Sequence, residues 1–100
     1  MLESEFVSLS EVALADIETE LDDSGRDLDY ATVGSGVLEI ELDDGSKIVV
    51  NRHVAMQEIW VAARAGGFHF RWDGNAWRDT RDGRELMRVF AELISAAPIR

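Results

Sequence analysis

Seven carboxylates and one base stand in the segment ADIETELDDSGRDLD, which covers residues 15–29. Its acids are Asp16, Glu18, Glu20, Asp22, Asp23, Asp27 and Asp29. Carboxylate oxygens are hard ligands that suit Fe²⁺, Fe³⁺, Mn²⁺, Ca²⁺ or Mg²⁺, weakly and with little selectivity when no imidazole or thiolate stands nearby. The EF-hand pattern D-x-[DN]-x-[DN]-G is absent, so this is no calcium loop of that kind. The segment therefore predicts a surface that attracts hard cations or a basic protein.

A helix over residues 4–23 must position most of these acids, because apolar residues recur there at steps of three and four. These apolar residues are Phe6, Leu9, Ala13, Ile17 and Leu21, with Leu14 beside them. Ser4 is the expected N-cap and Gly25 the expected stop. Two acidic stripes result on the polar side of the helix. One consists of Glu11, Glu18 and Asp22, and the other of Asp16, Glu20 and Asp23.

The single sign of this charge is unfavourable for the helix itself. Glu18/Asp22 and Asp16/Glu20 are like-charged i,i+4 pairs, each of which costs roughly 0.2–0.5 kcal/mol. Asp22 and Asp23 also stand at the C-terminal end, where the helix dipole favours cations by roughly 0.3–1 kcal/mol each. A charge run is usually only a solvated face, but a solubilising face would include lysines. Repeated energetic penalties from charges of one sign favour a functional interpretation of these acids.

The middle of the chain is typical of short strands joined by tight turns, with Asp-Gly turn signals at 44–45 and 73–74. We expect strands over 28–33 (an edge strand), 37–42, 47–51, 58–63, 68–72 and 75–79. A second helix follows, in which Asp82 and Glu85 have the spacing of an acidic capping box and Pro98 follows the end. We predict an α+β fold: a two-layer α/β sandwich with the N- and C-terminal helices packed on one face of a five- to six-stranded antiparallel sheet. Residues 1–100 form a single domain.

Strand alternation places Trp60 on the face of the sheet that points away from the helices. Asn51 is expected beside it on the preceding strand and His69 on the following one. An outward Trp in a strand is a candidate binding residue. The alternative is a Trp half covered by neighbouring side chains. His53 is expected in a loop or at an edge and receives no role.

Composition and motifs exclude several classes of protein. The net charge is −10, with 14 acids and one Arg in residues 1–44 but 6 acids and 9 bases in residues 45–100. The first half should repel nucleic acid and anionic lipid, so neither is an expected partner. No cysteine, signal peptide or run of 18 apolar residues is present, which favours a cytoplasmic protein. GxSxG, HExxH and phosphate-loop motifs are also absent, so an enzyme is not expected.

Several short segments, taken in order, resemble the frataxin family over nearly the whole chain. They are SEF at 4–6, IE-x-x-LDD at 17–23, GVL-x-I at 36–40, DGSKIVVNR at 44–52, IW at 59–60 and GG-x-HF at 66–70. The resemblance implies the same α/β sandwich and weak iron binding by acids of the first helix and the first strand edge. It also implies docking on the cysteine desulfurase of iron–sulfur cluster assembly and control of sulfur delivery to the scaffold protein.

Residue roles follow from the same resemblance. Glu18, Asp22 and Asp23 would bind iron and the desulfurase. The wider set of candidate metal ligands adds Asp27 and Asp29, which match the family pattern loosely, and Glu11, which shares a helical stripe with Glu18 and Asp22. Asn51 and Trp60 would face a partner on the open side of the sheet, and strand alternation adds His69 to these partner-facing residues. Ala55 and Glu58 depart from the family pattern, which usually has Pro and Gln at these positions.

The resemblance implies Fe²⁺ or Fe³⁺, weakly bound, with other hard divalent cations as substitutes, and a monomer in the absence of iron. An alternative function is a purely acidic adaptor that binds a basic protein surface and uses no metal. A third, an enzyme that oxidises Fe²⁺, ranks lowest because exposed carboxylates without histidine form a poorly organised metal centre.

Overall fold

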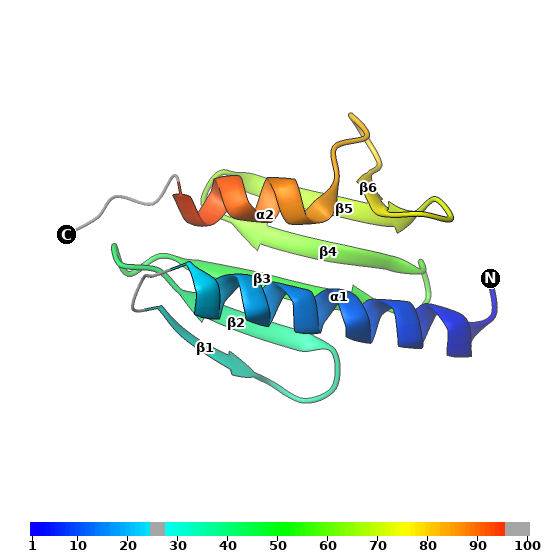
Figure 1. The fold of residues 1–100 in the computed structure, drawn as a ribbon, viewed down its shortest axis with the longest axis horizontal. Coiled ribbons are helices and arrows are strands. Elements are labelled where there is room, and N and C mark those ends of the chain that lie inside the picture. Colours follow the sequence, from blue (N-terminus) through cyan, green and yellow to red (C-terminus); the bar gives the residue numbers. More distant parts are fainter. Residues whose placement is uncertain (25–27, 96–100) are drawn as a thin grey trace.

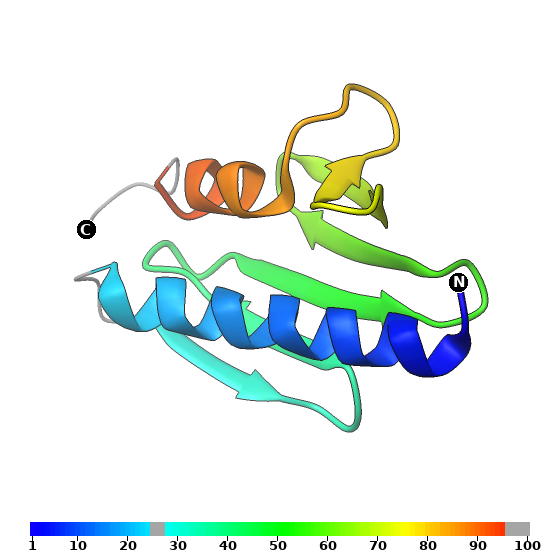
Figure 2. The same ribbon diagram turned by 45° about the vertical axis from the view of Figure 1, so that its right-hand side comes forward.

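The structure, a computed structural model, describes residues 1–24 and 28–95. Within them, two helices lie on one face of a six-stranded antiparallel sheet whose strands follow chain order (Figure 1). The elements are α1 (Glu3–Asp23), β1 (Asp29–Thr32), β2 (Val37–Glu41), β3 (Lys47–His53), β4 (Glu58–Ala63), β5 (Gly66–Trp72), β6 (Trp77–Asp79) and α2 (Leu86–Ser95). Figure 2 shows the same layers from a second angle. The predicted α+β sandwich is therefore confirmed. Neither described helix is long and apolar enough to cross a membrane.

The start of α1 differs from the prediction. The helix begins at Glu3 with Leu2 as its N-cap, so Ser4 is a helical residue and the predicted cap is wrong. The reason is Glu5, whose Oε1 accepts the backbone N–H of Leu2 at 3.3 Å and satisfies a donor at the helix start. At the other end, Ser24 Oγ donates to the carbonyl of Leu21 at 2.8 Å. Gly25, the predicted stop, lies outside the described residues.

The start of α2 also differs from the prediction. Asp82 Oδ1 accepts the backbone N–H of Arg84 at 3.0 Å, a bond that closes a turn ahead of the helix. The helix then begins at Leu86, so Asp82 lies too far upstream to cap it and the predicted capping box is wrong. Pro98 lies outside the described residues.

The register of the sheet follows the predicted alternation. Trp60 of β4 stands directly opposite Asn51 of β3 and His69 of β5. β1 is an edge strand, as predicted. β3 continues to His53, beyond the predicted end at 51, so the placement of His53 in a loop or at an edge is wrong. It is a residue of an inner strand, opposite Glu58.

One apolar core lies between the helices and the sheet. Fully buried side chains come from both layers, and the largest are Phe6, Ile17, Leu38, Ile40, Ile48, Ile59, Phe70, Leu86 and Phe90. Trp77 meets Phe6 edge-on, with ring centroids 5.8 Å apart, and meets Trp72 in the same way at 5.6 Å. Because Ile17 of α1 is buried here, the acids beside it along the helix are directed outward.

Candidate functional site

The C-terminal half of α1 carries a continuous acidic surface. We define the acidic surface of α1 as Asp16, Glu18, Glu20, Asp22 and Asp23. Three of these residues are exposed and two are partly exposed, while Ile17 and Leu21 between them are buried. The last turn of the helix has no basic residue. The penalties that the sequence predicts are therefore present in the folded helix.

Asp22 has a hydrogen-bond partner that the sequence patterns did not predict. The phenol of Tyr30, on β1, donates to Asp22 Oδ1 at 2.8 Å. This hydrogen bond is the main cause that raises the pKa of Tyr30, and burial and the nearby charges of Asp22 and Glu18 add to it. The bond ties the edge strand to the end of α1. Alternation along β1 could have indicated it, because Tyr30 stands opposite Ile40, which belongs to the core.

Glu11 lies apart from the acidic surface of α1 and has its own cation. Its Oε1 is 3.7 Å from Nη1 of Arg52, whose side chain is only 8% exposed. The same guanidinium donates to Ser35 Oγ at 2.8 Å and to Ser10 Oγ at 3.4 Å. Arg52 therefore joins α1 to the turn between β1 and β2. The charge of Glu11 is partly neutralised, unlike that of the acids nearer the end of the helix.

The structure places Asp29 away from Asp22. Asp29 is exposed at the start of β1, and its neighbour Tyr30 points toward α1, so Asp29 points to the opposite face of the sheet. It stands opposite Glu41 of β2. Asp27 lies outside the described residues. Within residues 1–24 and 28–95, no three or more His, Asp or Glu side chains are arranged to hold a metal ion.

Trp60 lies in a stack of three rings on the open face of the sheet. The imidazole of His53 is parallel to the indole, with centroids 4.1 Å apart and an interplanar angle of 17°. His69 covers the other side at 4.4 Å and 7°. Both histidines of the chain thus contact one tryptophan. Trp60 is half-buried, while Asn51 stands opposite it and is also half-buried. Strand alternation through Asn51 could have indicated His53.

The carboxylate of Glu58 contacts two members of this stack, Trp60 and His69. It accepts hydrogen bonds from the indole Nε1–H of Trp60 at 2.8 Å and from Nη2 of Arg71 at 2.6 Å. It also lies 3.6 Å from Nδ1 of His69. The residue is only 3% exposed. Burial raises the pKa of the Glu58 carboxyl, but the hydrogen bonds from Trp60 and Arg71 and the charges of Arg71 and His69 outweigh it and hold the pKa below its ordinary value. The carboxylate is therefore charged at neutral pH and fixes the indole.

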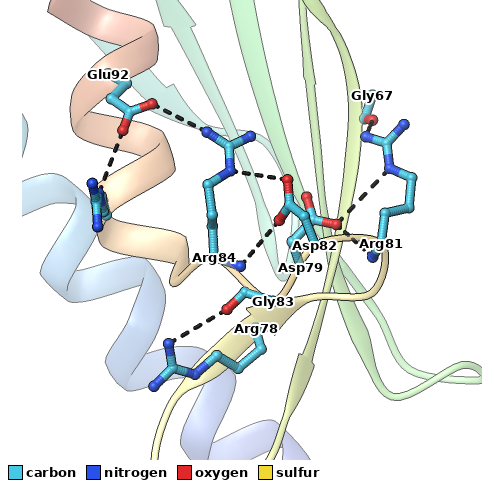
Figure 3. A network of polar contacts seen from close by, with 9 residues as sticks. Gly67, Arg78, Asp79, Arg81, Asp82, Gly83, Arg84 and Glu92 are labelled. Carbon is cyan, nitrogen blue, oxygen red and sulfur yellow. Dashed lines mark hydrogen bonds and ion pairs between the residues drawn. The ribbon is translucent and has the colours of Figure 1, made fainter.

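Most basic side chains of residues 45–100 form ion pairs with acids of this chain. In the loop before α2, Arg84 contacts Asp82 at 3.0 Å and Glu92 at 3.2 Å (Figure 3). Asp79 Oδ1 lies 3.9 Å from Nε of Arg81. These pairs neutralise charge locally. The largest concentration of uncompensated charge among the described residues is therefore the acidic surface of α1.

Comparisons with known proteins identify relatives of this chain. A family model described as a frataxin-like domain matches residues 1–98. An iron-sulfur cluster assembly protein CyaY from Dechloromonas aromatica is 59% identical over 95 residues, which cover 95% of this chain and 90% of the relative. A protein of the same name from Neisseria meningitidis serogroup B is 46% identical over 97 residues, covering 97% of this chain and 90% of the relative.

A solved structure has the same fold. The frataxin from Psychromonas ingrahamii matches with a TM-score of 0.84 and 28% identity, covering 97% of this chain and 92% of that chain. The family model, the sequence relatives and the shared fold all extend over nearly the entire chain. This protein belongs to the frataxin family.

Proposed function

We propose that this protein is an iron-binding regulator of iron–sulfur cluster assembly that docks on a cysteine desulfurase through the acidic surface of α1. The observation that carries the proposal is a run of outward carboxylates with no base in the last turn of the helix. The names of the relatives, which are iron-sulfur cluster assembly proteins, support the same process. The protein would modulate sulfur and iron delivery to the scaffold protein, acting in the cytoplasm as a monomer without iron.

The carboxylates suit iron as a loosely held cargo. Hard oxygen ligands accept Fe²⁺ and Fe³⁺. Because the described residues form no cluster of three metal-ligating side chains, each ion would be held by one or two carboxylates and completed by water. Glu18, Asp22 and Asp23 are the first candidates. Glu11 is a weaker one, because Arg52 already faces its carboxylate at 3.7 Å. Other hard divalent cations would compete for the same oxygens.

The open face of the sheet is the proposed second contact, toward the scaffold protein. Trp60, His69 and Asn51 stand next to one another across three strands. His53 joins them through its stack on the indole. Since both faces of the Trp60 ring are covered by imidazoles, a partner would meet the exposed edges of the three rings.

The alternative function is a metal-independent acidic adaptor that binds a basic protein surface. The same surface would serve it, because exposed carboxylates attract either a cation or a basic protein. Iron oxidation is the weakest candidate, since the acidic surface of α1 has no imidazole ligand beside it.

A metal titration separates the first two functions. We define the neutral variant as Glu18→Gln, Asp22→Asn and Asp23→Asn together. Adding Fe²⁺ without oxygen to the ¹⁵N-labelled protein should broaden amide signals of the last turns of α1, and the neutral variant should lose this response. Added cation should also raise the free energy of unfolding of the wild type but not of the variant, because only the folded wild type binds it preferentially. An adaptor would show no iron-specific broadening along α1.

A further inference from the structure

A small apolar pocket opens where α1, α2 and the β5–β6 hairpin meet. Its volume is about 230 Å³, and its walls include Val12, Trp72, Trp77 and Met87. Val12 is a large apolar side chain of α1 that is 60% exposed. Sites for drug-sized ligands span roughly 300–1,000 Å³. The pocket is therefore closer in size to one protein side chain than to a whole small molecule.

Two carboxylates line the same pocket. Asp16 is the member of the acidic surface of α1 nearest the pocket, and Glu85 directly precedes α2. Among the described residues, neither side chain has a hydrogen-bond or ion-pair partner. Unpaired carboxylates beside indole rings complement a cationic group on an aliphatic stem, because the stem packs on the apolar wall and the cation meets both the carboxylates and the ring faces.

We propose that this pocket receives an arginine side chain of the basic partner that docks on the acidic surface of α1. The inference rests on the proposed function and names a specific contact within it. A guanidinium is the best match, since its planar fork can stack on Trp72 and donate to more than one carboxylate. The pocket thereby extends the docking surface from α1 to Glu85, a residue that belongs to the otherwise basic second half of the chain.

Charge distinguishes an arginine side chain from the other candidate occupants, a neutral ligand and a second copy of this chain. A neutral ligand would bury part of Asp16 and Glu85 without neutralising either carboxylate, which is unfavourable. A second copy of this chain carries a net charge of −10 and would be repelled. A basic partner is attracted by the 14 acids of residues 1–44 and has cationic side chains to insert.

The first test needs no partner protein. The probe is N-acetyl-arginine N-methylamide, and the matched control probe is the neutral citrulline analogue. Indole N–H signals of Trp72 and Trp77 should shift with the arginine probe, while that of Trp60, on the opposite face of the sheet, should not. Asp16→Asn and Glu85→Gln should each weaken the probe about two- to fivefold. Glu20→Gln, which removes the same charge from α1 outside the pocket, should leave the shift of Trp72 unchanged.

The second test uses the purified desulfurase. Glu85→Gln should weaken its binding about two- to fivefold, whereas Glu92→Gln, with the same charge change farther along α2, should not. The proposal is overturned if citrulline shifts Trp72 as strongly as arginine does, or if Glu85→Gln binds the desulfurase like the wild type. If the wild type itself does not bind the desulfurase, the proposed function fails, and the probe titration then decides on the pocket alone. Thermal melts of each variant verify that it is folded.

Discussion

The carboxylate of Glu58 should determine how firmly Trp60 is held on the open face of the sheet. Two substitutions separate its contributions. Glu58→Ala removes both the acceptor for the indole N–H and the partner of Arg71. Glu58→Gln keeps an amide oxygen for the indole and removes only the charge. Because the residue is 3% exposed, water cannot simply replace the lost acceptor.

The magnitudes follow from the two contacts. Leaving the Trp60 N–H without an acceptor costs about 1–3 kcal/mol. The ion pair adds at most about 1 kcal/mol, since the Arg71 side chain is 60% exposed and regains water. We therefore expect Glu58→Ala to lower the free energy of unfolding by about 1–4 kcal/mol and Glu58→Gln by about 0.5–1 kcal/mol.

Urea unfolding followed by circular dichroism measures both values. The effect also depends on pH, because folding lowers the pKa of Glu58 from an ordinary value of 4.5. The stabilisation is complete above the unfolded pKa and is lost as the pH falls through the folded pKa. The gap between wild type and Glu58→Gln should therefore be constant near neutral pH and shrink below pH 4.5. If Glu58→Ala is as stable as the wild type at neutral pH, the carboxylate does not hold Trp60.

Three further predictions concern other parts of the molecule. Trp60→Ala should lower the free energy of unfolding by about 1–2 kcal/mol, less than the 3–5 kcal/mol typical of a fully buried ring, and it should reduce the effect of the protein on cluster assembly. A loss as large as that of a fully buried ring in thermal melts would assign Trp60 to the core. Gly36→Ala should cost about 1–3 kcal/mol, since φ is +83° and a new Cβ would stand 2.8 Å from Nε of Arg52; Gly34→Ala, with φ +66° and open space around it, should cost less, and equal losses in urea unfolding would mean that the contact with Arg52 is unimportant. The neutral variant should gain on the order of 1–2 kcal/mol at low salt, a gain that shrinks as salt rises; a less stable variant would show that these carboxylates are structural.

Much of the fold could be predicted because local periodicity and burial agree. The apolar spacing from Phe6 to Leu21 indicates α1, and the alternation of Leu38 and Ile40 indicates β2 with its inward side. Helix starts were less predictable. At the start of each helix a nearby carboxylate accepts a backbone N–H. Glu5 accepts that of Leu2, and Asp82 accepts that of Arg84 in a turn ahead of α2. Residue spacing alone does not determine which of several polar side chains accepts a given backbone N–H.

The partners of the site residues depend on contacts between distant parts of the chain. Glu11 meets Arg52 only because β3 passes beside α1, and Asp22 meets Tyr30 only because β1 lies along the edge of the sheet. Alternation predicts that Trp60 points outward, but not that His53 would cover one of its faces. Sequence patterns therefore locate the acidic surface of α1, while the structure distinguishes its uncompensated acids from Glu11.

The acidic surface of α1 is proposed to dock on a cysteine desulfurase by electrostatic attraction. The most direct measurement is the affinity of the two purified proteins as a function of salt, for the wild type and for a Glu18→Lys/Asp22→Lys variant. Wild-type affinity should fall steeply as salt rises, and charge reversal should abolish binding. An affinity that stays flat from low to high salt, or a charge-reversed variant that binds like the wild type, would contradict it.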